Sequence, residues 1–336
     1  MPMRVWRVLP ALAIVTLFVC STAWGQQAAQ ANWKDRAEYD LYESITKATD
    51  PAKRIELLTT WQQKYPDSDF KSTRQLLLVE AYQATNQIEK ALQVGGEAMA
   101  ADPKNFRLLW LIVTSVLRLQ TPTPELLAVA DKAAKILISD FDSLRPAGVS
   151  EADWEKSRND VVAMGHMTLG WTAMQRKENP AAEKAFKESL KLSPNSAQVS
   201  YWLGTVLLLQ QTTDKVSEGL FHLARAVSYT GEGALTPEAR KNLEAYLIKT
   251  YNRFHGSHDG LDELRNLAAS QAFPPEDFRI KSSAEIAAEM EEEFKKSNPM
   301  LALWMSVKKE LAGDNGAQYF ESSVKEAKLP GGVQGI

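Results

Sequence analysis

Two histidines and an aspartate stand close together late in the sequence and could bind a metal ion. His255, His258 and Asp259 fall within one short stretch, and two imidazoles with a carboxylate can supply ligands to zinc. No second cluster stands at a matching spacing. Gly256 and Gly260 favour a turn at this point, where polar residues are usual. A solvated turn is therefore the favoured interpretation, and a metal-binding enzyme that uses His255 and His258 is kept as an alternative.

The other residues that could carry out catalysis are isolated from one another. His166 and His222 stand among apolar residues, so we predict that both pack inside the fold. The sequence contains no Gly-x-Ser-x-Gly, no His-Glu-x-x-His and no phosphate-binding Gly-x-x-x-x-Gly-Lys, which are the motifs of common hydrolases and nucleotide-binding proteins. Its single cysteine, Cys20, lies in an apolar N-terminal segment. We therefore expect no catalysis, no cofactor and no resident metal.

Composition and charge exclude two further classes of protein. Of the 336 residues, 44% are hydrophobic and 24% are charged, which is typical of a globular chain rather than a disordered one. The formal net charge is -3, from 39 basic and 42 acidic residues. A protein that binds nucleic acid usually carries clustered basic residues, so no nucleic-acid partner is expected.

The first 25 residues resemble an export signal. Arginines precede an apolar run that ends at Cys20, and two small residues, Ala23 and Gly25, follow it two positions apart. This is the pattern that a signal peptidase recognises. We predict a signal peptide over residues 1–25, cleavage after Gly25, and a mature chain that is periplasmic or secreted.

Two alternatives remain for this N-terminal segment. The apolar run could be retained as a membrane anchor, although it is shorter than the roughly 20 residues that a spanning helix requires. Cys20 could instead carry a lipid, although Val19 stands where a small residue is expected. Under either alternative the chain would be a structural accessory of an envelope complex. Association with a membrane is expected only in these two cases.

The rest of the sequence carries an internal repeat, whose best-marked copy covers residues 163–196. Apolar residues at helical spacing form a first helix, a turn follows, and a second helix ends near Pro194. Small residues at Gly170 and Ala182 would let the two helices approach closely, and Phe186 would fill the space beneath them. Proline lacks an amide donor, so the second helix must end close to it.

This copy resembles a tetratricopeptide repeat, a helix–turn–helix unit of about 34 residues. The residues that match the family's pattern are Leu169, Gly170, Ala182, Phe186 and Pro194. Looser copies are expected near residues 33–67, 72–105, 106–141, 197–231 and 241–274. The resemblance therefore covers residues 33–274 and implies an all-α fold, a right-handed α-solenoid of about six units, some of them degenerate.

The character of the sequence changes after residue 274. Three amphipathic helical segments are expected at residues 282–296, 300–311 and 319–327, and we predict that residues 275–327 form a C-terminal helical cap. A repeat array leaves its last apolar face bare, and a terminal element is needed to cover it. Residues 328–336 carry no structural signal and are expected to be a disordered tail.

The resemblance also predicts where a partner would bind. In this family the first helix of each repeat lines a concave groove, and methionine and aromatic side chains suit adaptable binding surfaces. The residues expected on the groove are Leu76, Trp110, Met164, Met167, Trp171, Met174, Tyr201, Lys249 and Arg253. The alternative is that the preceding helical segment covers the central methionines and Trp171, which would make them part of the core.

Together these features predict a non-catalytic scaffold that binds a protein or peptide through the groove of the array. The export signal places its action in the cell envelope or outside the cytoplasm. Nothing in the sequence identifies the partner.

Overall fold

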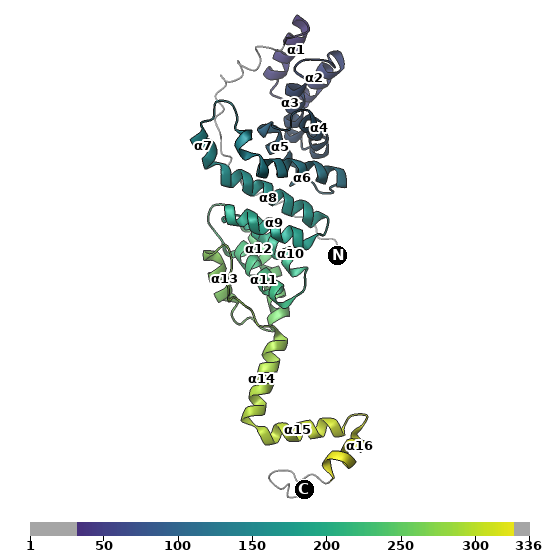
Figure 1. The fold of residues 1–336 in the computed structure, drawn as a ribbon, viewed down its shortest axis with the longest axis vertical. Coiled ribbons are helices and arrows are strands. Elements are labelled where there is room, and N and C mark those ends of the chain that lie inside the picture. Colours follow the sequence, from purple (N-terminus) through teal and green to yellow (C-terminus); the bar gives the residue numbers. More distant parts are fainter. Residues whose placement is uncertain (1–31, 326–336) are drawn as a thin grey trace. The chain divides into compact units, whose positions relative to one another are not determined.

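The computed structural model describes residues 32–325, and every regular element within this range is helical (Figure 1). The signal peptide predicted for residues 1–25 and the tail predicted for residues 328–336 lie outside the described residues. The described chain divides into two compact units. Residues 32–252 and 258–279 form the first, here called the helical array, and residues 253–257 and 280–325 form the second, here called the C-terminal unit.

The helical array consists of helix–turn–helix pairs that follow one another along the chain. Consecutive helices pack together, most extensively α8 with α9, α10 with α11, and α3 with α4. The helices are α1 (Arg36–Lys47), α2 (Pro51–Lys64), α3 (Lys71–Ala84), α4 (Ile88–Ala101), α5 (Phe106–Val116), α6 (Pro124–Ser139), α7 (Glu151–Lys156), α8 (Arg158–Gln175), α9 (Asn179–Leu192), α10 (Ala197–Leu208), α11 (Thr213–Ser228), α12 (Pro237–His255) and α13 (Leu261–Ser270). Short turns between paired helices place them antiparallel. The all-α, tetratricopeptide-like array expected from the sequence is confirmed.

The close helix approach predicted for the best-marked repeat is present between α8 and α9. A Cβ atom added at Gly170 would lie 2.5 Å from the ring of Phe186, so no larger residue fits without a shift. Phe186 and Ala182 are both fully buried. In the next pair, a Cβ atom at Gly204 would lie 2.9 Å from the carbonyl oxygen of Gly219, so backbone meets backbone there.

The turns inside three of the pairs share one unusual backbone conformation. Asn86, Lys177 and Gln211 have φ angles of 57°, 62° and 59°, and they follow α3, α8 and α10 respectively. Residues other than glycine and asparagine seldom adopt this left-handed backbone conformation. Its recurrence after the first helix of these three pairs shows that the turn geometry, and not the residue type, is repeated.

Two buried arginines tie the helices of the array together through carbonyl groups. Arg74 on α3 donates to the carbonyl of Tyr65 at 2.8 Å. Arg225 on α11 donates to the carbonyls of Pro194 at 2.7 Å and Ala268 at 3.1 Å. These carbonyls lie at or just beyond the C-terminal ends of α2, α9 and α13. Helix C-termini carry partial negative charge, which offsets the cost of burying each guanidinium.

A short insertion joins α6 to α8. It contains a 3-10 turn over Phe141–Leu144 and the six-residue helix α7. Trp154 of α7 stacks on Phe141 with ring centroids 4.4 Å apart, and its indole N–H donates to the Phe141 carbonyl at 3.0 Å. The Trp154 ring also meets the ring of Phe106 on α5 edge-on, with centroids 4.8 Å apart, so the insertion is packed onto the array rather than loosely attached to it.

The C-terminal unit is built from α14 (Ser283–Ser297), α15 (Pro299–Leu311), α16 (Gly316–Tyr319) and a π-helical turn over Phe320–Val324. Ser282 and Glu285 form a capping box at the start of α14, and Pro299 begins α15. None of the helices within residues 32–325 combines the length and the hydropathy that a membrane span requires. The role of this unit as a cap of the array stays a prediction.

Candidate binding pocket

Four of the nine predicted groove residues lie in the core of the array. Leu76, Met164, Met167 and Trp171 are exposed by only 9%, 6%, 8% and 4%. Leu76 lies on α3, and the other three lie on α8, which packs against both α6 and α9. These four side chains therefore belong to the core and not to an open groove. The alternative named the core for the two methionines and Trp171, but α6 and α9 bury them rather than the segment just before α8.

The other five predicted groove residues are more accessible. Trp110, Met174 and Tyr201 are half-buried, and burial raises the pKa of the Tyr201 hydroxyl. Lys249 and Arg253 are exposed on α12. That these residues contact a partner stays a prediction.

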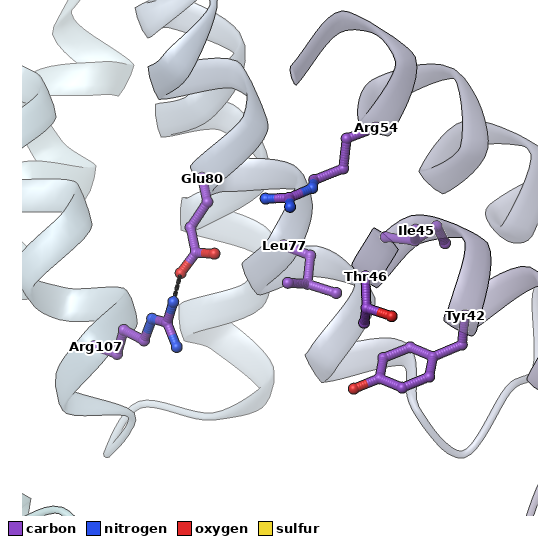
Figure 2. Close-up of a pocket in the computed structure, with 7 residues that line it drawn as sticks. All are labelled: Tyr42, Ile45, Thr46, Arg54, Leu77, Glu80 and Arg107. Carbon is purple, nitrogen blue, oxygen red and sulfur yellow. Dashed lines mark ion pairs between the residues drawn. The ribbon is translucent and has the colours of Figure 1, made fainter. Parts of the chain in front are cut away.

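A pocket of about 270 Å³ opens instead at the N-terminal end of the array (Figure 2). Residues from α1, α2, α3 and α5 line it, so three successive first helices contribute to one hollow. The lining residues are Tyr42, Ile45, Thr46, Arg54, Leu77, Glu80 and Arg107. The pocket thus combines apolar walls with three charged groups.

An ion pair occupies one side of the pocket. Arg107 of α5 lies 2.5 Å from the Glu80 carboxylate of α3, whose side chain is only 19% exposed. Burial raises the pKa of the Glu80 carboxyl, and the nearby Arg107 opposes that rise without cancelling it. Positive neighbours favour the ionised form of such a buried carboxyl.

Arg54 brings a second guanidinium to the same pocket. Its terminal nitrogen donates to the Ala48 carbonyl at 3.0 Å, and its buried Nε has no hydrogen-bond partner among residues 32–325. Figure 2 shows Arg54 and Arg107 reaching toward Glu80 from different helices. Two guanidinium groups therefore face one carboxylate, which leaves a net charge of +1 in the lining.

This arrangement suits a ligand that carries a carboxylate on an apolar stem. A guanidinium binds a carboxylate through two parallel hydrogen bonds, and two guanidinium groups line the pocket. Ile45 and Leu77 supply apolar wall, and Tyr42 also lines the pocket. The pocket can therefore bind an acidic group and its aliphatic chain together.

The sequence reasoning found only part of this site. Leu76, one of the residues predicted to line the groove, lies one helical turn before Glu80 on α3, and Glu80 lines the pocket. Arg54 and Arg107 were missed, because they lie on helices that only the tertiary packing brings together. An arginine on an amphipathic helix gives no local signal that separates a pocket residue from an ordinary surface residue.

The histidines occupy different environments. His222 is fully buried, as expected for a packing residue, and burial lowers its pKa to about 3. His166 is half-buried, and burial lowers its pKa as well. His255 places its Nδ1 2.8 Å from the Lys281 carbonyl oxygen. Across residues 32–325, no three His, Cys, Asp or Glu side chains come together as a set that could hold a metal ion.

Comparison with solved structures finds a likeness to a thermophilic TPR protein of Thermus thermophilus. The likeness has a TM-score of 0.34 and 16% sequence identity, and it covers 64% of this chain and 95% of that chain. No protein-family model and no curated protein sequence matches the chain. The tetratricopeptide-like description therefore rests on the helix pairs and on the residues that pack them.

Proposed function

We propose that the chain is a non-catalytic scaffold that binds a protein or peptide, and that a carboxylate of this partner docks between Arg54 and Arg107. The observation that carries the proposal is the charge imbalance of the pocket, where two guanidinium groups face one carboxylate that is costly to ionise. A carboxylate from a ligand would balance the second guanidinium, which gives the pocket a reason to prefer acidic partners.

The architecture supports a polymeric partner rather than a free metabolite. Three successive first helices contribute to the pocket, and an array of this kind offers an extended surface along which a chain can lie. A single acidic side chain or a terminal carboxylate would then be one anchor of a longer contact. Neighbouring residues of the partner would supply the rest of the affinity.

A selection from a random peptide-display library tests the proposal without knowledge of the natural partner. We expect the selected peptides to share a carboxylate, and replacement of that acid by its amide to abolish capture. The outcome that contradicts the proposal is a selected set that lacks acids, or no selection at all by a folded chain.

We further propose that the mature chain acts in the cell envelope or outside the cytoplasm. Support comes from the arginines, the apolar run and the small residues that end at Gly25. Mass spectrometry of the N-terminal peptide from cells tests this directly. A start at Gln26 is the expected result, whereas a retained Met1 or a lipid on Cys20 would contradict cleavage and favour an anchored accessory.

A further inference from the structure

The C-terminal unit leaves an unusual number of apolar side chains in contact with solvent. No residue of α14 is buried, and Val307 is the one buried residue of α15. Trp304, Leu301 and Met305 on α15 are exposed by 50%, 50% and 56%, and Met290 on α14 by 66%. Soluble monomers rarely expose a contiguous apolar patch of this kind, and such patches mark interaction sites.

The exposed residues of α15 fall on adjacent faces of the helix. At 100° per residue, Met300 and Trp304 share one face, and Leu301 and Met305 share the next. Helices as short as α14 and α15 are marginal in water unless an apolar face is packed. The two helices therefore need a partner that presents an apolar surface of similar width.

The area available matches what a second copy would bury. The large apolar side chains that this unit presents to solvent each have between 36% and 66% of their surface exposed. Because a large side chain offers roughly 200 Å², together they present on the order of 900 Å². One partner in an interface of standard size contributes about 800 Å², so a pair of identical surfaces would form a stable contact.

The charges of the two helices are complementary to each other. α14 carries the acidic run Glu291–Glu293, and α15 ends with the exposed lysines Lys308 and Lys309. Lys295 on α14 already pairs with Glu291 at 2.8 Å and with Glu292 at 3.3 Å, whereas no ion pair of Lys308 or Lys309 occurs within residues 32–325. In a two-fold dimer every contact occurs twice, so α15 of each copy could meet α14 of the other. A membrane surface fits less well, because the glutamates beside the apolar patch would be repelled by anionic headgroups.

We propose that two copies of this chain associate through α14 and α15, with the apolar residues at the centre and the Glu291–Glu293 and Lys308–Lys309 charges around them. This proposal does not depend on the binding pocket. Its consequence for binding is that one assembly would carry two pockets, which would raise the avidity for a partner with repeated acidic segments.

Sedimentation equilibrium of the purified full chain over a concentration series tests the proposal. We expect a monomer–dimer equilibrium whose dissociation constant rises about tenfold or more in Trp304→Glu. Leu209→Glu is the matched control, since Leu209 is also 50% exposed but lies at the end of α10 in the array. Circular dichroism checks that both variants keep their helix content.

A charge-exchange experiment separates a specific dimer from general stickiness. Lys308→Glu/Lys309→Glu and Glu291→Lys/Glu292→Lys/Glu293→Lys should each weaken self-association, because like charges then meet twice. An equimolar mixture of the two variants should restore dimers, because both contacts become complementary. A wild type that stays monomeric at every concentration, a Trp304→Glu variant that dimerises normally, or a mixture without recovery would overturn the proposal. A wild-type chain that floats as a monomer with phosphatidylglycerol vesicles would also overturn the proposal.

Discussion

Two clusters of charged residues in the helical array use the same kinds of ion pair in different ways. In the first, between α9 and α11, Lys187 lies 2.7 Å from Glu183 and 2.8 Å from Glu218, and Lys215 also pairs with Glu183. Gln210 donates to Glu183 at 2.8 Å. Two positive charges meet two negative charges. In the second cluster, at the N-terminal pocket, Arg107 pairs with Glu80 and Arg54 lines the same pocket.

The two carboxylates respond to burial in opposite directions. Burial opposes the ionisation of Glu183, but hydrogen bonds from Lys187, Lys215 and Gln210 outweigh it and lower its pKa to about 2. Burial prevails at Glu80, and its pKa is raised despite Arg107. A closed, balanced cluster therefore stabilises the fold. The open, unbalanced one fits the proposal that the carboxylate of a partner completes it.

The largest expected effect comes from breaking the balanced cluster. Glu183→Gln should lower the free energy of unfolding at pH 7 by about 3 kcal/mol, because it leaves Lys187 and Lys215 without a shared partner. Urea denaturation measures this loss. Lys191→Gln is the control, since its pair with Glu188 is exposed and should contribute less than about 1 kcal/mol. A loss of the same size in both variants would contradict the distinction.

The next effect concerns the buried His222 beside the balanced cluster. The groups that influence its charge are Lys187 and Glu183 on α9 and Glu218 and Arg225 on α11. Because its folded pKa, about 3, lies below the ordinary value of 6.5, the unfolded chain binds its proton first. Stability is therefore complete above pH 6.5 and declines as the pH falls toward 3.

This decline should amount to about 1.4 kcal/mol for each pH unit below the unfolded pKa, or about 2 kcal/mol at pH 5. His222→Leu removes the titrating group and should flatten the stability profile between pH 6.5 and 5. Urea midpoints across that range provide the measurement. Identical slopes for the variant and the wild type would show that another group causes the acid sensitivity.

The smallest effect is expected at Glu80, and its sign is opposite. A raised folded pKa means that the protonated form is favoured by folding, so this group stabilises below pH 4.5 and its contribution is lost as the pH rises. Glu80→Gln mimics the protonated form. It should change stability at pH 7 by less than about 1 kcal/mol, in either direction, because the amide keeps a hydrogen-bond acceptor for Arg107. A loss as large as that of Glu183→Gln would remove the contrast between the clusters.

The packing within each repeat was readable from the sequence, because it depends on residue types at fixed spacing. Gly170 and Phe186 meet as predicted, since only a residue without a side chain lets the ring approach α8 this closely. The left-handed backbone conformation of these turns is indicated by the residue type at one position only. Asn86 is a residue that tolerates this conformation, whereas Lys177 and Gln211 are not.

The sequence predicts less well which side chains stay exposed on the surface. Helical period shows which side chains share a face, but it does not show which neighbour covers that face. Met167 and Trp171 share a face as predicted, yet α6 and α9 bury them. Arg54 and Arg107 come from separate pairs, and their convergence on Glu80 depends on how successive pairs stack.

The affinity of pocket variants for a selected acidic peptide tests the central claim most directly. Isothermal titration calorimetry should show that Arg54→Gln and Arg107→Gln each weaken binding by about tenfold or more. Arg36→Gln is the matched control. Arg36 lies on α1, a helix that lines the pocket, but it pairs with Asp40 on the exposed surface. This variant should bind the peptide as the wild type does. Equal affinity in all four proteins would contradict the assignment of the pocket as the site where the partner's carboxylate docks.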